Sequence, residues 1–346
     1  MPLIDEIREQ PSVARRLLAE WRRSDLEGYA QPILPQRPAF ALLAARGTSD
    51  NAALYAQYLL AVRNGLVAAL ATPSTITLYG ARPRMNDALV VGISQSGRSP
   101  DIVAVLEEAA RQGASTVAIT NDTSSPLALA ASHVIDLMAG PEKATAATKT
   151  YTAELLAVTR LSAMIDPLTD AEGAALGRVP DLMESALATE PGAQVLAAHH
   201  AERNQAIVLG RGYGYATARE WALKMQELAQ LPALAYSAAD FEHGPLALAE
   251  PGLAVMAVAP SGVELDAQMA LLRRLQRDHG ARLLVISDDP DARRLDEGLP
   301  LPEGVGGWIG PIIEIIPAQL FTYHLTSARG LDPDQPRTIT KVTRTV

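Results

Sequence analysis

The sequence predicts an α/β protein made of two tandem, doubly wound domains, each with a mostly parallel sheet flanked by helices. Short apolar runs typical of buried strands alternate along the chain with amphipathic helical segments, as in parallel sheets. The pattern also repeats, because Arg46-Gly47 and Arg211-Gly212 stand 165 residues apart, as do Ser96-Gly97 and Ser261-Gly262. An equal offset at two separate landmarks indicates a tandem duplication.

The first half begins with a charged segment over 3–24 that predicts a helix, broken by the proline-rich stretch 32–38. We therefore expect a helical N-terminal arm over 1–35 and a first domain over 36–180. The expected strands are Ala39–Ala45, Ala68–Ala71, Leu89–Ile93, Ser115–Thr120 and Val134–Leu137. The expected helices are Asn51–Arg63, a helix that opens at Pro100, and Thr148–Met164, with a short apolar segment near Ile76.

Residues 166–195 are rich in proline, glycine and alanine, with helical stretches between, and we interpret them as the connection between the domains. The pattern then restarts in a second domain over 195–330, followed by a C-terminal tail over 331–346. Its expected elements are strands Ala206–Gly210, Leu253–Ala259 and Arg282–Ser287, helix Thr217–Gln230 and a helix after Gly262.

The composition excludes several classes of function. Among the 346 residues, 48% are hydrophobic and only 4% aromatic, which predicts sizeable aliphatic cores. The net charge of −9, with both signs interspersed, argues against a nucleic-acid partner. The chain has no cysteine, which excludes disulfides, thiolate metal sites and cysteine nucleophiles. The N-terminus lacks an apolar signal core and no apolar run could span a membrane, so we expect a cytoplasmic protein without a membrane partner.

The loop Ser94–Ser99 is the most informative segment, because it joins a buried strand to the helix that opens at Pro100. Hydroxyls and backbone N–H groups at a helix N-terminus form an anion site. The loop contains no lysine, so it is not a P-loop. In the second copy, Ala259–Gly262 has lost two donor side chains, and Pro260 has no N–H. We therefore expect one phosphate site per chain, for a small molecule such as a sugar phosphate.

A second loop, Gly47–Ser49, places two hydroxyls before a helix, and its glycine permits a tight backbone path. Alone, such a loop is more often a plain helix cap. Loops of a doubly wound sheet gather, however, at the carboxyl ends of the strands, where ligands bind. Two hydroxyl-rich loops in one repeat therefore favour a binding site.

Three charged groups or segments of the second half are candidates for chemistry, each with a structural alternative. Glu220, Lys224 and Glu227 share one helix face, which is most often a surface ion-pair ladder. His243 precedes a Gly-Pro turn and could act as an acid–base group, although a structural loop histidine explains it equally well. Lys341 lies in a terminal tail of the kind that is usually disordered.

Together these pieces resemble the sugar isomerase (SIS) family, in particular the isomerase half of glucosamine-6-phosphate synthase. The resemblance covers the chain from about residue 36 to the end. In the first domain it rests on Gly47–Ser49, Ser94–Gly97, Ala139–Glu142 and Thr148-Lys149. In the second domain and tail it rests on Leu209–Gly212, Lys224–Leu228, His243–Ala247, Arg329-Gly330, Pro336-Arg337 and Lys341.

The resemblance implies a role for each matching residue. Glu227 would move a proton between sugar carbons C1 and C2, and Lys341 would handle the open-chain carbonyl through ring opening and an imine. His243 would open the ring in the neighbouring subunit of a homodimer, and no metal or cofactor would be needed. The substrate- and phosphate-binding candidates are Gly47, Thr48, Ser49, Ser94, Gln95, Ser96, Ser99, Thr145, Glu220 and Lys224.

Three departures from the family pattern bear on the substrate. Arg46 replaces a cysteine, Ala147 replaces a serine, and Asp240–Glu242 replaces a Glu-x-Lys. No glutaminase domain or cysteine is present, so we expect ammonia not to come from glutamine. The resemblance favours glucosamine-6-phosphate deaminase, which yields fructose 6-phosphate and ammonia. The alternatives are an isomerase or deglycase of another (amino)sugar 6-phosphate, or a non-catalytic sugar-phosphate sensor, which would need an attached DNA-binding region.

Overall fold

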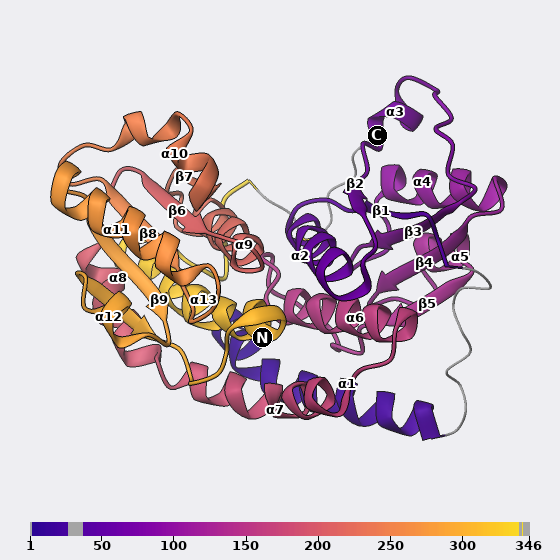
Figure 1. Ribbon diagram of the computed structural model, residues 1–346, viewed down its shortest axis with the longest axis horizontal. Coiled ribbons are helices and arrows are strands. Elements are labelled where there is room, and N and C mark those ends of the chain that lie inside the picture. Colours follow the sequence, from indigo (N-terminus) through magenta and orange to yellow (C-terminus); the bar gives the residue numbers. More distant parts are fainter. Residues whose placement is uncertain (1, 27–36, 339–340, 342–346) are drawn as a thin grey trace. The chain divides into compact units, whose positions relative to one another are not determined.

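The computed structural model describes residues 2–26, 37–338 and 341 and divides the chain into two compact units. Unit 1 consists of Met1–Pro11, Lys143–Thr148 and Arg178–Ile339. Unit 2 consists of Ser12–Glu142, Lys149–Gly177 and Thr340–Val346. Each unit contains one five-stranded sheet (Figure 1). Most of the predicted proline-rich break, over 32–36, lies outside the described residues.

The sheet of unit 2 is entirely parallel, as predicted for the first repeat. Its strands are β1 (Phe40–Ala44), β2 (Ala68–Leu70), β3 (Ala88–Ile93), β4 (Ser115–Thr120) and β5 (His133–Asp136), in the spatial order β2-β1-β3-β4-β5. All five expected strands are therefore confirmed, with ends that differ by at most one residue. Every residue of β3 is buried, which explains its uninterrupted apolar sequence.

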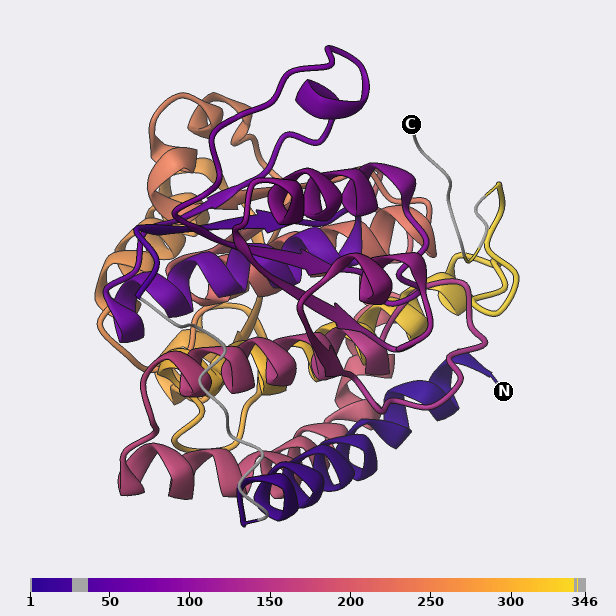
Figure 2. The same ribbon diagram turned by 90° about the vertical axis from the view of Figure 1, so that its right-hand side faces the viewer.

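Helices cover both faces of this sheet (Figures 1 and 2). On one face, α2 (Thr48–Asn64) packs against α6 (Lys149–Ile165). On the other face lie α4 (Pro100–Arg111) and α5 (Pro126–Ala130), with the short α3 (Ser74–Thr77) beside α4. The alternation of strand side chains decides which helix each one meets, so Val90 and Ala118 join Ile102 and Leu106 in one core.

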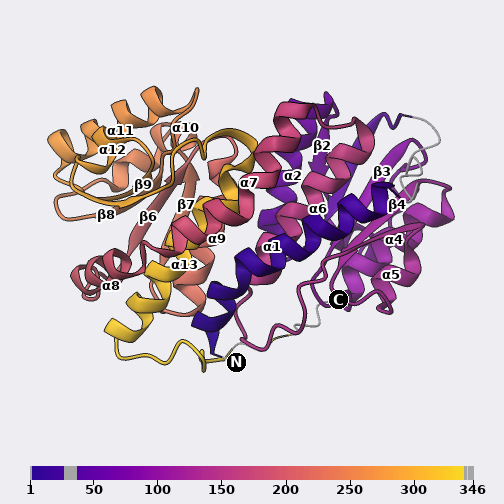
Figure 3. The same cartoon turned by 90° about the horizontal axis from the view of Figure 1, so that it is seen from below.

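Two long helices contribute residues to both units, namely α1 (Leu3–Leu26) and α7 (Asp170–Leu187). Within unit 2, the second half of α1 lies beside α6 and the first part of α7 (Figure 3). A cavity of about 160 Å³ remains between them, beside Trp21. The Arg160 guanidinium stands 5.9 Å from the centre of the Trp21 ring, a cation–π contact that supports this packing.

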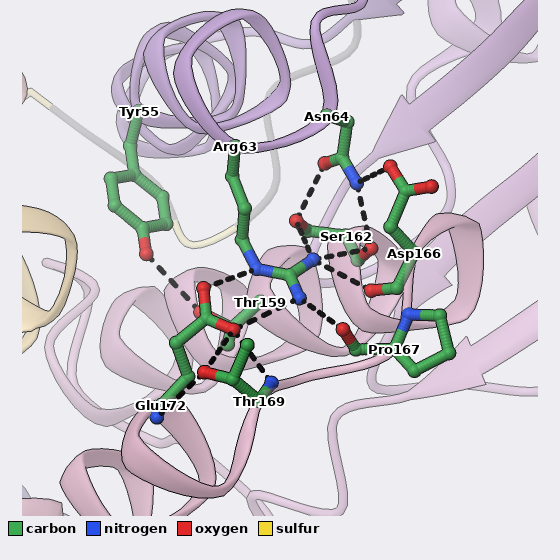
Figure 4. Close-up of polar contacts among 9 residues, drawn as sticks. All are labelled: Tyr55, Arg63, Asn64, Thr159, Ser162, Asp166, Pro167, Thr169 and Glu172. Carbon is green, nitrogen blue, oxygen red and sulfur yellow. Dashed lines mark hydrogen bonds and ion pairs between the residues drawn. The ribbon is translucent and has the colours of Figure 1, made fainter.

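Arg63, near the end of α2, binds the turn between α6 and α7 (Figure 4). Its guanidinium donates to the backbone oxygens of Asp166 and Pro167, both at 2.8 Å, and to the Glu172 carboxylate at 2.9 Å. The neighbouring Asn64 donates to the Asp166 carboxylate at 2.8 Å. A cation at the carboxyl end of α6 satisfies carbonyl groups that the helix itself leaves unpaired.

The sheet of unit 1 repeats the same topology with the order β10-β9-β8-β6-β7. Its strands are β6 (Ala206–Gly210), β7 (Ala233–Ser237), β8 (Ala254–Val258), β9 (Arg282–Ser287) and β10 (Glu297–Pro300), and all neighbours pair in parallel. The three predicted strands are confirmed. The edge strands β7 and β10 were not predicted, because each is short and has only one buried residue.

Helices again lie on both faces of this sheet (Figure 1). One core joins α10 (Ala238–Glu242), α11 (Leu265–His279) and α12 (Pro290–Arg293) to the strands. Opposite lie α9 (Gly214–Glu227) and α13 (Gly310–Ala328), with α8 (Glu190–His199) packed on α13. Two 3-10 turns complete the unit, η1 (Pro245–Leu248) and η2 (Gly307–Ile309). Among the described helices, none combines the length and apolar character needed to cross a membrane.

The helix predicted over Thr217–Gln230 is one turn out of place, because α9 begins at Gly214 and ends at Glu227. The chain enters this helix directly from the loop that follows β6, since Gly214 donates to the backbone oxygen of Arg211 at 3.1 Å. The connection predicted over 166–195 contains α7 and the start of α8, and Pro180 lies inside α7.

Candidate functional site

The switch point of the unit 2 sheet lies between β1 and β3, where the strand order reverses. Ligands of doubly wound sheets bind outside the carboxyl ends of the strands at such a point. The loop after β1 is Gly47–Ser49 and the loop after β3 is Ser94–Ser99. Because β1 and β3 pair in parallel with Ala44 opposite Gly92, the two hydroxyl-rich loops leave the sheet side by side.

The Ser94–Ser99 loop is anchored by its backbone and leaves several donors open. Ser94 donates its N–H to the Ile119 oxygen of β4 at 3.0 Å, and its hydroxyl accepts from the Gly97 N–H at 3.2 Å. Ser99 is the N-cap residue of α4, yet its hydroxyl makes no capping bond. Within the described part of the chain, the Ser99 hydroxyl and the Gln95 amide have no hydrogen-bond partner. These open donors at a helix N-terminus suit an anion.

Gly97 has a conformation that only glycine adopts easily, with φ at +61°. A Cβ built on it would lie 2.1 Å from Ser125 Oγ and 2.9 Å from Thr120 Oγ1. The close approach of this loop to β4 and α5 therefore depends on the absence of a side chain at residue 97.

We expect Gly97→Ala to lower the free energy of unfolding by about 2–4 kcal/mol, because the left-handed backbone and the steric overlap add together. Chemical denaturation measures the loss. The displaced loop should also abolish stabilisation by phosphate in a thermal-shift assay. Gly113→Ala serves as the control, since residue 113 also has a positive φ of +76° but no atom within 4 Å of the added Cβ. Equal losses in the two variants would contradict the steric explanation.

In the other loop, Gly47 is the N-cap residue of α2 with φ at +55°, and a glycine has no side chain that could cap the helix. The two hydroxyls of this loop therefore follow the N-cap position. The half-buried Thr48 opens the helix, whereas the buried Ser49 donates its hydroxyl to Glu154 Oε1 at 2.7 Å. Glu154 was not predicted as a site residue, because it comes from α6, far from the loop in sequence.

Lys341 belongs to unit 2 and pairs with a buried carboxylate. Its ammonium lies 2.5 Å from Glu142 Oε2. The Glu142 side chain is fully buried, and it also accepts from the Thr150 hydroxyl at 2.7 Å and the Thr150 N–H at 3.1 Å. A buried carboxylate with several donors holds the lysine in one place. Glu142 was predicted only as part of a motif, not as a partner of Lys341.

In unit 1, α9 carries Glu220, Lys224 and Glu227 on one face, as the spacing predicts. The face is not an exposed surface ladder, because Glu220 and Lys224 are buried and the Glu227 side chain is only 25% exposed. The Lys224 ammonium lies 2.5 Å from Glu227 Oε2 and 3.3 Å from Glu220 Oε1. Burial alone would lower the pKa of Lys224, but the two carboxylates outweigh it and raise that pKa above its ordinary value.

The remaining predicted site residues also lie in unit 1. His243 is exposed at the end of α10 and donates its N–H to the Asp240 oxygen at 3.1 Å. Its imidazole has no partner among the described side chains. Thr145 is half-buried in the segment Lys143–Thr148, which is anchored where Lys143 and Ala144 donate their N–H groups to the buried Glu6 carboxylate at 2.6 and 3.2 Å.

The corresponding switch point of unit 1, between β6 and β8, has a different chemistry. Pro260 lacks an N–H, and the Ser261 N–H donates to Asp288 Oδ1 at 2.6 Å. The fully buried Glu314 of α13 accepts from the Thr217 hydroxyl at 2.9 Å. The pKa of Glu314 is raised to about 8, chiefly by burial and to a lesser extent by the nearby carboxylates of Asp288 and Glu264. Carboxylates at this position disfavour an anion, in agreement with the loss of donors in the second repeat.

Glu314 makes the stability of the protein depend on pH. Its folded pKa, about 8, lies above the ordinary 4.5, so the folded state retains a proton that the unfolded state loses. The contribution of Glu314 to the free energy of unfolding is therefore complete below about pH 4.5. It decreases as the pH rises toward 8, by up to about 1.4 kcal/mol per pH unit. We expect Glu314→Gln to remove this slope in urea unfolding between pH 5 and 8. The exposed-residue control Glu303→Gln should keep it, and an unchanged slope in Glu314→Gln would contradict the assignment.

The fold and the site define a class of protein: a duplicated, doubly wound α/β protein with a serine-rich loop at the switch point of its first sheet. The SIS domain model matches residues 40–164 and 200–329. The chain therefore belongs to the SIS domain family and contains two SIS repeats.

Individual relatives agree with this assignment. Glutamine–fructose-6-phosphate aminotransferase (isomerizing) of Methanothermobacter thermautotrophicus is 36% identical over 345 residues, which are 98% of this chain and 56% of that protein. The C-terminal domain of glucosamine-fructose-6-phosphate aminotransferase from Francisella tularensis superposes with a TM-score of 0.87 at 28% identity, covering 96% of this chain and 97% of that domain. A protein of Silicibacter pomeroyi proposed to be a phosphosugar isomerase gives 0.85 at 34% identity, covering 95% and 98%. The predicted resemblance to the isomerase half of the synthase is confirmed.

Proposed function

We propose that this chain converts glucosamine 6-phosphate and water to fructose 6-phosphate and ammonia. The observation that carries the proposal is the loop Ser94–Ser99, whose open donors lie at the switch point of an SIS sheet. Sugar-phosphate isomerisation is supported by the relatives, which are named as isomerizing aminotransferases acting with fructose 6-phosphate. Because the chain spans little more than half of such a relative, its activity is argued from its own residues.

In the proposed reaction, the phosphate is bound by the two loops of unit 2. The proposed binding residues are Gly47, Thr48, Ser49, Ser94, Gln95, Ser96 and Ser99, with Thr145, Glu220 and Lys224 in supporting positions. Hydroxyls and backbone N–H groups of this kind hold a dianion without a lysine. The half-buried setting of Ser94–Ser99 limits competition from water.

Glu227 is proposed to remove the proton from C2 of the open-chain sugar and return it to C1. This transfer changes the aldose into an enolamine and then into a C2 imine, which water hydrolyses to the ketose and ammonia. A carboxylate suits such a step, and the Lys224 ammonium, 2.5 Å from Glu227 Oε2, holds it in position.

Lys341 is proposed to assist ring opening and to engage the open-chain carbonyl through an imine. An amine forms a carbinolamine and then an imine with a carbonyl carbon, losing water that returns on hydrolysis. The buried Glu142 supports this role, because it holds the ammonium in place by a 2.5 Å contact. His243, exposed and without a partner among the described side chains, is proposed to open the ring of a substrate bound to a second subunit.

The test is a screen of the full chain against hexosamine 6-phosphates, N-acetylhexosamine 6-phosphates and fructosamine 6-phosphates, with ammonia and ketose measured separately. Ammonia together with fructose 6-phosphate from glucosamine 6-phosphate alone supports the deaminase. Ketose without ammonia identifies an isomerase, and release of an amine other than ammonia identifies a deglycase. Thermal stabilisation by these compounds without any turnover identifies a sensor. Sedimentation equilibrium of the same preparation tests the proposed homodimer.

A further inference from the structure

We propose that Arg46 is a substrate-binding residue that contacts the phosphate directly and supplies the positive charge of the anion site. This inference rests on the proposed function, since it assigns a further residue to the same phosphate. Arg46 lies between the end of β1 and the start of α2, at the carboxyl edge of the sheet. The loop Gly47–Ser49 follows it directly.

A buried carboxylate holds the Arg46 side chain at this edge. Arg46 Nε donates to Asp101 Oδ2 at 2.8 Å, and the Asp101 side chain is only 2% exposed. Asp101 lies in the first turn of α4, two residues after the N-cap Ser99. The arginine therefore extends from the loop after β1 to the helix that the Ser94–Ser99 loop opens, and it spans the switch point from one side to the other.

The rest of the guanidinium is available to a ligand. Asp101 uses the Nε donor, and the other four N–H groups of Arg46 have no partner among the residues the structure describes. The side chain is 48% exposed, so these donors face solvent at the same edge as the two loops. A guanidinium presents its donors in a planar fork that matches the oxygens of a phosphate.

Charge balance explains why a cation is needed at this position. The Asp101 carboxylate is stabilised by the positive end of the α4 dipole, but its negative charge repels a phosphate bound at the same helix terminus. Arg98, the other arginine of the loop, pairs with Asp122 at 3.1 Å. The net charge of the chain is −9, so an unassisted dianion would approach against the overall field. Arg46 both offsets Asp101 and offers free donors to the ligand.

Calorimetric titration of the full chain with inorganic phosphate and with fructose 6-phosphate tests the proposal without requiring turnover. We expect Arg46→Ala to lower the affinity for both ligands by about 10- to 100-fold, the change typical when a hydrogen bond to a charged group is lost. Arg46→Lys keeps the charge but not the fork, so it should recover part of this loss. Arg111→Ala is the matched control, because Arg111 forms an exposed ion pair with Glu108 at the far end of α4. The Arg111→Ala variant should bind both ligands with wild-type affinity.

The double variant Arg46→Ala/Asp101→Asn separates direct contact from mere neutralisation of Asp101. If Arg46 only neutralises the negative charge of Asp101, removing both charges restores phosphate binding, and the proposal is overturned. If Arg46 touches the phosphate, the double variant stays about as weak as Arg46→Ala. Wild-type affinity in a folded Arg46→Ala variant would also overturn it. Should the wild type bind neither ligand, the proposed function itself fails, which is a distinguishable result.

Discussion

Glu227→Gln is expected to lower kcat for amino-sugar 6-phosphate turnover by about 10²- to 10⁴-fold, the range for loss of a general base. Glutamine keeps the shape of the side chain and an oxygen for the Lys224 ammonium, now 2.5 Å from Glu227 Oε2, but cannot accept the substrate proton. Phosphate binding should persist, because Glu227 is not part of the Ser94–Ser99 loop. Steady-state kinetics and thermal shifts with fructose 6-phosphate measure the two effects independently.

Lys341→Ala should likewise abolish turnover while phosphate binding persists. Lys341 differs from Glu227 in that its loss removes the ammonium that pairs with the buried Glu142 carboxylate, so a lower melting temperature is expected as well. Glu303→Gln, an exposed carboxylate of unit 1, is the control and should keep full activity. If Glu227→Gln kept more than about a tenth of the wild-type kcat, Glu227 would not be the general base.

Lys224→Met is expected to cost about 3–5 kcal/mol of unfolding free energy, the loss typical when one member of a buried ion pair is removed. The variant leaves Glu220 buried, with its Oε1, now 3.3 Å from the ammonium, facing an apolar side chain. Urea unfolding at neutral pH measures the loss. The exposed pair of Asp291 in α12 and Arg294 directly after it provides the comparison, since Arg294→Met should change stability by less than about 1 kcal/mol.

A second variant and the pH dependence sharpen this prediction. The double variant Lys224→Met/Glu220→Gln also removes the negative charge of Glu220, so it should recover a large part of the lost unfolding free energy. Additive losses from the two substitutions would show that the pair is not coupled. The folded pKa of Lys224 is raised, so its contribution is complete below the unfolded lysine pKa and is lost only at higher pH. The cost of Lys224→Met should therefore not diminish between pH 7 and pH 9.

The loop Ser94–Ser99 shows how much of the candidate site could be predicted from sequence. Strand, serine-rich turn and helix are neighbours in the chain, and their order alone predicts the open donors of Ser94–Ser99 at a helix N-terminus. The 165-residue offset likewise predicts the second sheet, and Pro260 predicts that its switch point lost the anion site. Local patterns carry these features because each is formed by consecutive residues.

The edge strands and the buried charges were not predictable in this way. The β7 strand has one buried residue in five, so its stability comes from pairing with β6 rather than from its own sequence. The spacing of Glu220, Lys224 and Glu227 is the same for a surface ladder and for a buried ion triad. Only the burial of Glu220 and Lys224 in the folded chain decides between them.

The amino-acid sequence by itself determined the two doubly wound repeats, the serine-rich loop Ser94–Ser99 and the resemblance to the SIS family, because periodicity, turns and motif order are local properties. The tertiary structure decided which charges act together: Arg46 with Asp101, Lys341 with Glu142, and Lys224 with two carboxylates out of solvent. Partners such as Lys341 and Glu142 are 199 residues apart, and the strength of their attraction depends on burial. Neither their proximity nor their burial can be read from spacing.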